Sequence, residues 1–303
     1  MTEHTLLSYG GWERCLRISN GVMELVVTLD VGPRIIRCGF KNDRNHFVEY
    51  PEQLGRTGDA EYHSYGGHRL WIAPEERPRT YYPDNNPVDW KQSGEWYHIR
   101  PPAETIGFQK ELSIRLDPEK PIACIQHRIT NLANEPRRIS AWSLSVMAAG
   151  GTAVIPHEPF QAHSEQLLPA RLLVLWSYTD MADRRWKWGK TLISLSQDPN
   201  AASPQKIGAF NTIGWAAYLN GNQLFLKHFA ADPTGQYPDF GCNCEFFTNS
   251  RMLELESLSP LKTLAQGESI MHEEHWLLAR DVKPEASEES LRSNLESLIS
   301  SFS

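Results

Sequence analysis

The chain has 303 residues, of which 40% are hydrophobic and 22% charged, and its 10 tryptophans supply enough aromatic mass for a sizeable core, so extensive disorder is excluded. The formal net charge of −7 and the lack of clustered Lys and Arg argue against a nucleic-acid-binding protein. Because all-β domains often reach roughly 200 to 250 residues, we expect one large domain with a small tail.

Hydropathy and cysteine usage indicate the compartment. No stretch approaches the roughly 20 apolar residues of a membrane-spanning helix, and the first residues lack the basic and apolar regions of a signal peptide. We therefore expect a soluble, cytoplasmic protein with no membrane partner. Five cysteines, an odd number scattered over a long chain, favour reduced, buried thiols. Cys242 and Cys244 lack the spacing and the neighbouring histidines of a metal site, so no metal is expected.

Strands dominate the predicted elements. Alternating or β-rich runs occupy residues 15–18, 23–29, 34–40, 108–116, 122–130, 138–147, 172–178, 192–196, 212–219, 223–229, 243–248, 251–258 and 270–278. Asn20-Gly21 and Asn220-Gly221 favour the positive-φ turns that close hairpins, so antiparallel connections are expected. The fold class is therefore predicted to be mostly β.

Two segments depart from the strand pattern. Residues 51–97 are rich in Gly, Pro, Asp, Asn, His and aromatics, which predicts a long ordered loop of the kind that often carries function. Helical periodicity occurs only at the end, where Ser287 is a plausible N-terminus and one face carries Leu291, Leu295, Leu298, Ile299 and Phe302. The prediction is one β-sandwich domain over residues 1–283, with a helical tail over residues 284–303 packed on it.

The common catalytic motifs are absent from the sequence. It contains no GxGxxG, Walker A, GxSxG or HExxH pattern, and HEEH at residues 272–275 has the wrong spacing and lies in a predicted strand. Nucleotide binding and zinc proteolysis are therefore disfavoured.

The loop around YGGHRLWIAPE, residues 65–75, gathers the chemistry of a sugar site. Over residues 62–90 it gathers His63, His68, Arg69, Glu75, Asp84 and Asn85 among Trp71, Tyr81 and Tyr82. A sugar stacks its apolar face on aromatic rings, and its hydroxyls pair with such polar groups, while Gly66-Gly67 would let the backbone approach a ligand. The alternative is a surface loop whose polar groups only satisfy one another.

A second polar cluster lies in residues 239–261. In a strand, Glu254 and Glu256 share one face and Leu253 and Leu255 the other. If the glutamate face is solvated, the pair has no function; if it is partly desolvated, burial suits a carboxylate to general-base work. Glu245 is predicted to face the same groove.

For two weaker candidates, both a structural role in the core and a role in ligand binding stay open. His127 alternates with Ile125 and Ile129, which favours a hydrogen-bonded core histidine over a ligand. Trp186 and Trp188 suit either a stacking platform or the core.

These segments resemble the galactose mutarotase-like, or aldose 1-epimerase, superfamily. The resemblance rests on GGHRLW followed by APE, on PDNNPV and on the late strand LELESLSPL, and more weakly on DVGPRII, HRITN, SAWSLSVMAAGG and HEEHWLL. It spans residues 20–278 and is greatest to a bacterial subgroup with the GGHRLW segment. It implies an antiparallel β-supersandwich.

The resemblance also implies site residues. In such epimerases a late-strand glutamate takes the proton of the anomeric hydroxyl, and a histidine protonates the ring oxygen. The glutamate corresponds to Glu256, with Glu254 as the register alternative. The family's acid histidine follows a strand that here reads SAWSLSVMAAGG and contains no histidine. Either His68 has the acid role, or Glu75 or His163 supplies it, or catalysis has been lost.

The expected function is a mutarotase-like isomerase that interconverts anomers of a free sugar or sugar acid. Its catalytic residues are predicted to be Glu256 and His68. The predicted substrate-binding residues are Arg34, Arg69, Trp71, Glu75, Asp84, Asn85, Glu245 and Glu254. No cofactor is expected, the partner is a small-molecule sugar, and the protein is expected to be a monomer or homodimer. The alternatives are a non-catalytic carbohydrate-binding or sensing protein, or a carbohydrate lyase or hydrolase on the same fold.

Overall fold

Two large antiparallel sheets build the protein, as seen in a computed structural model that describes residues 2–282 and 287–300. Within those residues the first sheet has 11 strands and the second has 10. The first sheet runs in the order β1 (Glu3–Tyr9), β2 (Trp12–Ser19), β3 (Met23–Thr28), β4 (Ile35–Phe40), β5 (Gly67–Ala73), β10 (Arg137–Met147), β19 (Leu253–Leu258), β18 (Cys244–Thr248), β15 (Gln205–Ala209) and β12 (Leu173–Leu175), with β20 (Lys262–Leu264) paired to β10. The second runs β13 (Trp186–Trp188), β14 (Leu192–Ser196), β11 (Thr152–Pro156), β16 (Trp215–Asn220), β17 (Gln223–Phe229), β21 (Ser269–Arg280), β9 (Ile122–Asn131), β8 (Phe108–Leu116), β7 (Trp96–Arg100) and β6 (Asp89–Ser93).

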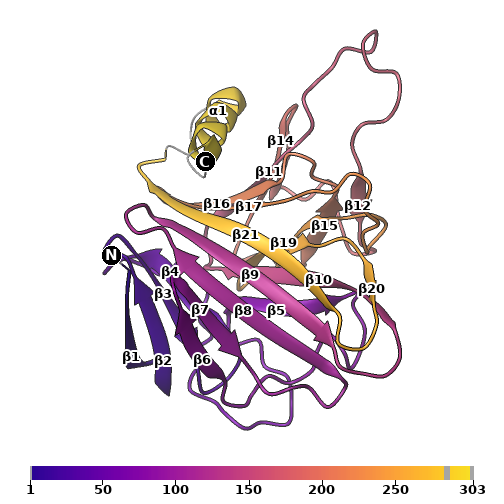
Figure 1. Ribbon diagram of the computed structural model, residues 1–303. Helices are drawn as coiled ribbons and strands as arrows, with labels where there is room; N and C mark the ends of the chain where they lie inside the picture. Colours follow the sequence, from indigo (N-terminus) through magenta and orange to yellow (C-terminus); the bar gives the residue numbers. More distant parts are fainter. Residues whose placement is uncertain (1, 283–286, 301–303) are drawn as a thin grey trace.

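The main core lies between the sheets. Figure 1 shows β9 and β21 of the second sheet lying across β10 of the first, and these strands are in contact. Alternate residues of each strand point into this space, so that Leu253 and Leu255 of β19 join one large apolar cluster with Ile125 and Ile129 of β9. The predicted fold class, a mostly β antiparallel sandwich with a C-terminal helix, is confirmed.

The predicted hairpin turns are also confirmed. Gly21 and Gly221 have φ of 88° and 58°, and they connect the antiparallel pairs β2–β3 and β16–β17. Glycine tolerates this left-handed region without a Cβ clash. All five cysteines are free and buried, as the sequence predicted.

The largest departure from the sequence prediction is β5. The GGHRLW segment was expected in an irregular loop over residues 51–97, but Gly67–Ala73 is a strand between β4 and β10, in the middle of the first sheet. Every residue of β5 is buried, because other side chains cover both faces of the sheet. Such a strand lacks the polar and apolar alternation that identifies a strand with one solvated face.

Other differences are smaller. The predicted strand over residues 212–219 begins only at Trp215, after a turn in which Gly214 has φ of 78°. The run over residues 172–178 is a strand only over Leu173–Leu175. The sequence prediction missed β1, β6, β7, β11, β13, β15 and β20, most of which are short.

The helix α1 (Glu288–Ile299) packs on the outer side of the second sheet. Its N-cap is Ser287, whose side chain accepts a hydrogen bond from the Ser290 backbone N–H. Leu295 is fully buried in a cluster with residues of β14, β16 and β17. Phe302, which was predicted on the same face, and the predicted boundary at residue 283 lie outside the described residues. No helix in the described part of the chain is long and apolar enough to cross a membrane.

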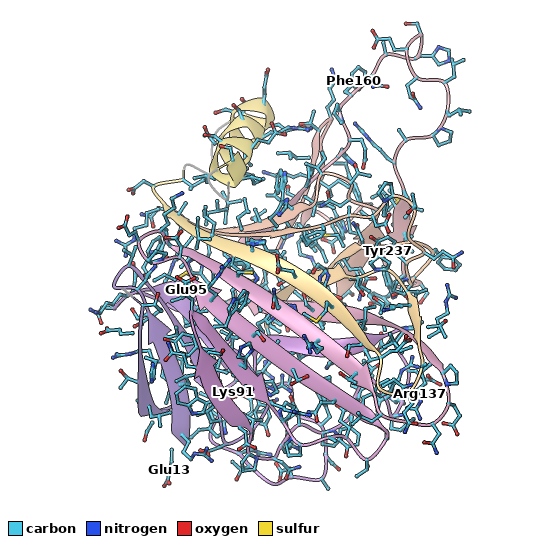
Figure 2. The ribbon with its side chains drawn as sticks, viewed as in Figure 1. Glu13, Lys91, Glu95, Arg137, Phe160 and Tyr237 are labelled. Carbon is cyan, nitrogen blue, oxygen red and sulfur yellow. The ribbon has the colours of Figure 1, made fainter. Side chains whose placement is uncertain are left out.

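An arm of residues 157–172 leaves the body between β11 and β12. Figure 2 shows Phe160 on this arm, well away from the sheets. Leu167 and Leu168 in the arm are 76% and 74% exposed. His163, one of the acid candidates, lies here and is exposed, so the structure does not bring it to the first sheet.

Candidate functional site: a polar and aromatic face of the first sheet

The outer face of the first sheet, on the side away from the second sheet, carries an unusual group of polar and aromatic side chains. The ladder sets Arg69 of β5 opposite Leu144 of β10, Leu144 opposite Glu256 of β19, and Glu256 opposite Glu245 of β18. Directly opposed residues in a ladder share a face. We call this the site face; Glu254 and Glu256 lie on it together, with Leu253 and Leu255 on the core side, as predicted.

One lysine lies between two carboxylates on the site face. Lys206 of β15 places its Nζ 2.7 Å from Glu245 Oε2 and 3.3 Å from Glu256 Oε2. Trp142 Nε1 of β10 also donates to Glu256 Oε2, at 2.8 Å. The side chains of Glu245 and Glu256 are 0% exposed and that of Lys206 is 7% exposed. This group is therefore shielded from bulk water.

An arginine–glutamate pair lies beside it. Arg69 Nη2 donates to Glu254 Oε1 at 2.9 Å, and the guanidinium lies 4.4 Å from the centre of the Trp71 ring. Such an arrangement combines a charge-assisted hydrogen bond with a cation–π contact. The pair fixes the position of Arg69 on the site face.

The electrostatics of the face follow from burial. Burial raises the pKa of Glu245 and of Glu254, although Lys206 and Arg69 respectively oppose that shift. Burial lowers the pKa of Lys206, but the neighbouring Glu256 and Glu245 carboxylates outweigh it and hold the pKa well above its usual range. Lys206 is thus a permanent cation, whereas Glu245 has a tendency to carry a proton.

Several buried polar atoms on this face have no hydrogen-bond partner among the described residues. They are Glu256 Oε1, Glu245 Oε1, and Arg69 Nε and Nη1, together with the Tyr62 hydroxyl beside them. A buried polar group without a partner is costly, and such groups are rare in folded proteins. Their concentration on one face suits that face to a polar ligand.

An aromatic wall borders these polar atoms. The Trp71 ring centre lies 5.0 Å from that of Tyr81, 5.2 Å from that of Trp142 and 5.7 Å from that of Tyr62. Glu75, predicted as a substrate contact, is exposed and accepts a hydrogen bond from the Tyr81 hydroxyl, so it lies at the rim. Aromatic faces next to hydrogen-bonding groups are suited to a sugar ring.

The segment after β12 covers the other end of the face. The Trp176 ring lies 4.6 Å from Lys206 Nζ. Burial raises the pKa of Tyr178 to about 12, and Lys206, Glu256, Glu75 and Glu245 all influence it. Because Tyr178 is 40% exposed, it lies at the rim of the face.

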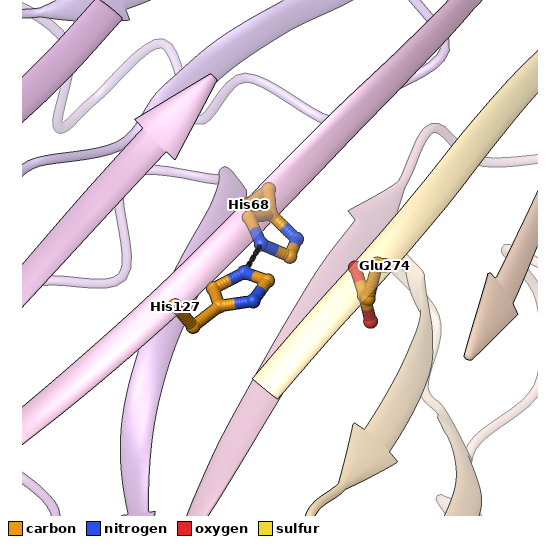
Figure 3. A group of neighbouring side chains, drawn as sticks. All are labelled: His68, His127 and Glu274. Atoms are coloured by element: carbon orange, nitrogen blue, oxygen red, sulfur yellow. Dashed lines mark hydrogen bonds between the residues drawn. The ribbon is translucent and has the colours of Figure 1, made fainter. Parts of the chain in front are cut away.

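His68 lies on the opposite face of the first sheet and does not reach Glu256. It points into the space between the sheets, where its Nε2 is 2.7 Å from His127 Nε2 and its Nδ1 is 2.9 Å from Ser145 Oγ. Figure 3 shows the two rings meeting from different sheets. Adjacent residues of a strand point to opposite faces, so Arg69 and Trp71 are on the site face whereas His68 is not. The expected pairing of His68 with Glu256 is therefore absent from this structure.

The hydrogen bonds around His68 assign its tautomer. His127 Nδ1 donates to the His272 carbonyl at 3.0 Å, so its Nε2 is an acceptor when the ring is neutral. His68 then donates from Nε2 and accepts at Nδ1 from Ser145. Burial lowers the pKa of both rings, which keeps them neutral. His127 is thus the hydrogen-bonded core histidine that the sequence favoured.

A metal is a poor fit to this inner cluster, although His68, His127 and Glu274 bring three donor atoms together (Figure 3). Lys227 Nζ already lies 2.7 Å from Glu274 Oε1, and Trp276 Nε1 donates to Oε2 at 2.8 Å. The Nε2 atoms of His68 and His127 are already hydrogen-bonded to each other. A second group, Cys124, Glu273 and His275, is also unsuitable, because burial raises the pKa of the Cys124 thiol to about 12.

Three further predicted substrate contacts hold loops together instead. Arg34 donates to the carbonyls of His63 and Ser64 and pairs with Asp84 at 2.8 Å. Asn85 accepts from the Tyr65 hydroxyl and donates to the backbone of the loop over residues 59–61. These contacts brace the segments on either side of β5.

Gly66 and Gly67 likewise face protein backbone. A Cβ on Gly66 would lie 2.1 Å from the Val48 carbonyl oxygen, and one on Gly67 would lie 2.5 Å from that of Ile35. The expected close approach to a ligand is therefore an approach to neighbouring backbone.

Comparison with known proteins gives the fold a name. No family model and no curated protein sequence matches the chain. Among solved structures, the Slr1438 protein of Synechocystis has a TM-score of 0.58 at 11% identity, over 91% of this chain and 99% of that one. A galactose mutarotase-like protein from Lactobacillus casei has a TM-score of 0.54 at 8% identity, over 88% of this chain and 100% of that one. The fold is galactose mutarotase-like.

A third match points the same way. A galactose mutarotase related enzyme from Lactobacillus acidophilus has a TM-score of 0.50 at 10% identity, over 89% of this chain and 98% of that one. At such identities the likeness shows the galactose mutarotase-like fold alone. Membership of the narrower subgroup with the GGHRLW segment stays a prediction.

Sequence reasoning missed three residues of the site face. Lys206 lies in the short strand β15, Trp142 in β10, and Trp176 just after β12. The alternation of Trp142, Leu144 and Val146 with small residues in SAWSLSVM was a usable signal for Trp142. Lys206 gave no such signal, because only its neighbours across the sheet reveal that it is buried.

Proposed function

We propose that this protein is a mutarotase-type carbohydrate epimerase that interconverts the anomers of a neutral aldose. The observation that carries the proposal is the site face itself, where Trp71 borders buried polar atoms of Glu256, Arg69 and Glu245 that have no hydrogen-bond partner in the described part of the chain. The likeness to solved structures described as galactose mutarotase-like is consistent with it.

The chemistry requires a base for the anomeric hydroxyl. Glu256 is suited to this role because Trp142 and Lys206 hold Oε2, which leaves Oε1 as an acceptor without a partner. When Oε1 takes the proton from O1, the C1–O5 bond breaks, O5 keeps the electron pair and takes a proton from an acid, and the open-chain aldehyde forms. Rotation about C1–C2 followed by ring closure gives the other anomer.

The charges of the face favour an uncharged sugar. Lys206 is already paired with Glu245 and Glu256, and Arg69 with Glu254. Arg34 is bound to Asp84. A phosphate or carboxylate on the sugar would have to displace one of these carboxylates, which costs a buried ion pair. The sugar-acid option from the sequence is therefore the weaker one.

The rival is a carbohydrate-binding protein without turnover. The complete burial of the Glu245 and Glu256 side chains favours it, because a structural ion-pair cluster has the same appearance. Sugar binding without anomer interconversion, unchanged in Glu256→Gln, would support this rival.

The test follows anomer interconversion of freshly dissolved aldoses by polarimetry or NMR. We expect catalysis with at least one aldose, and a loss of at least about 10²-fold in kcat in Glu256→Gln. Glu104→Gln is the matched control, since Glu104 is also a buried glutamate 2.7 Å from a lysine, Lys110, but lies outside the site face. Equal rates of anomer interconversion in wild type and Glu256→Gln would refute the proposal.

A further inference from the structure

Ring opening also needs an acid that protonates the ring oxygen of the sugar. The identity of this acid is inferred on the basis of the proposed function. Glu245 and Glu256 stand directly opposite each other in the β18–β19 ladder, and Lys206 reaches between them from β15. His68, the expected acid, is on the other face of the sheet. The site face therefore has to supply the acid from its own residues.

The charge balance of this group places one exchangeable proton on it. Two carboxylates and one ammonium would bury a net negative charge, and a buried carboxyl group without compensation takes up a proton instead. Glu256 has two donors on Oε2, Trp142 Nε1 at 2.8 Å and Lys206 Nζ at 3.3 Å. These two donors engage Oε2, so Glu256 is the carboxyl group that is already hydrogen-bonded within the protein.

Glu245 is the partner that carries the proton. Its Oε2 lies 2.7 Å from Lys206 Nζ, and its Oε1 has no hydrogen-bond partner among the described residues. Lys206 opposes protonation of Glu245, but the full burial of this carboxyl group outweighs it, so the pKa of Glu245 lies well above its usual range. The face then holds one base and one acid.

We propose that Glu245 is the general acid and that Lys206 is the positioning residue that separates the roles of the two carboxyl groups. Glu256 takes the O1 proton while the C1–O5 bond breaks, and the electron pair stays on O5, which receives the proton of Glu245. In the open-chain state Glu245 is the anion and Glu256 the acid. Ring closure returns both protons, so the enzyme is unchanged. Lys206 lies within 3.3 Å of both carboxylates and stabilises whichever is charged.

Access to Glu245 requires a movement of its cover. Gly208, opposite Glu245 in the ladder, leaves room that the Cys242 Sγ and the Trp176 ring fill; a Cβ there would lie 2.3 Å and 3.3 Å from them. Because Glu245 has no exposed surface, a sugar reaches it only when the protein groups that cover it move.

The experiment compares kcat, KM and the pH profile of anomer interconversion in wild type, Glu245→Gln and the Glu104→Gln control. In Glu245→Gln we expect kcat to fall at least about 10²-fold, KM to change little and the alkaline limb of the profile to disappear. Glu104→Gln is expected to keep wild-type kinetics. The titratable groups around Glu245 are Lys206 on β15, Glu256 on β19, Tyr178 after β12, Asp239 and Cys242 before β18, and Cys244 on β18.

A second variant keeps the assignment testable if Glu245→Gln does not fold. Lys206 lowers the pKa of Glu245, so Lys206→Met is expected to move the alkaline limb to higher pH as well as to lower kcat. If the alkaline limb of the pH profile stays in place in Lys206→Met, or if Glu245→Gln keeps the wild-type kcat, the assignment of Glu245 as the acid is overturned. Either result leaves the proposed function standing. Absence of turnover by wild type on every sugar overturns the proposed function, and the assignment with it.

Discussion

The buried ion pair between the sheets gives the sharpest stability prediction. Lys227 of β17 and Glu274 of β21 have 0% exposed side chains and lie 2.7 Å apart. At an effective dielectric constant of about 20, Coulomb's law gives roughly 6 kcal/mol of attraction at this distance. Three donors from Ser143, Ser257 and Trp276 remain on Glu274 when the ammonium is removed. We therefore expect Lys227→Met to lower the free energy of unfolding by about 3 to 5 kcal/mol.

The pH dependence of that loss follows from the sign of the shift. Burial raises the pKa of Glu274, but the positive groups around it, led by Lys227, together outweigh burial and hold the pKa well below its usual range. A depressed carboxyl pKa contributes stability that is present above the unfolded pKa, about 4.3, and is lost as the pH falls through the folded pKa. The difference between wild type and Lys227→Met should therefore be largest near neutral pH and shrink as the pH falls below about 4.3.

The assay is urea unfolding at several pH values, with Lys227→Met/Glu274→Gln as the matched control. The double variant removes both charges, so it is expected to recover most of the lost stability at neutral pH. A loss below about 1 kcal/mol in Lys227→Met would refute the reasoning. So would a loss that does not change with pH.

Two further predictions concern β5 and the substrate. Gly67→Ala should cost at least about 2 kcal/mol in urea unfolding, because φ is 70° and the new Cβ would lie 2.5 Å from the Ile35 carbonyl oxygen. Gly94→Ala, with φ of 59° and open space, should cost only about 1 kcal/mol; equal losses would contradict this. An aldose should be interconverted at least about tenfold faster than its 6-phosphate in the mutarotation assay, since displacing a paired carboxylate costs more than 1.4 kcal/mol. Faster turnover of the phosphate would contradict the charge argument.

The sequence predicted the turns and the helix of this fold better than it predicted the buried strand β5 in the middle of the first sheet. Hairpins closed by Asn-Gly and the helix capped by Ser287 depend on local backbone preferences, which the sequence carries directly. The strand β5 depends on what covers its two faces. Its neighbours β4 and β10 lie about 30 and 70 residues away along the chain, and no local sequence pattern identifies them as its neighbours.

The same limit applied to the site. Period-2 alternation was enough to put Glu254 and Glu256 on one face, because that inference needs only the strand itself. Whether that face was solvated depended on Lys206, Trp142 and Trp176, which come from three other segments. Asp84 and Asn85, the expected sugar contacts, pair with Arg34 and Tyr65, which were equally suited by type to bind a ligand.

Once β5 is known to be a strand, the GGHRLW segment acquires two separate roles. His68, Leu70 and Ile72 point into the core, whereas Arg69 and Trp71 point to the site face. No register shift can bring His68 and Arg69 to the same side, because adjacent strand residues always diverge. A mechanism that uses Arg69 beside Glu256 therefore cannot use His68 as its acid in this structure. The proton for the ring oxygen has to come from the site face, where Glu245 is the buried carboxyl group directly opposite Glu256.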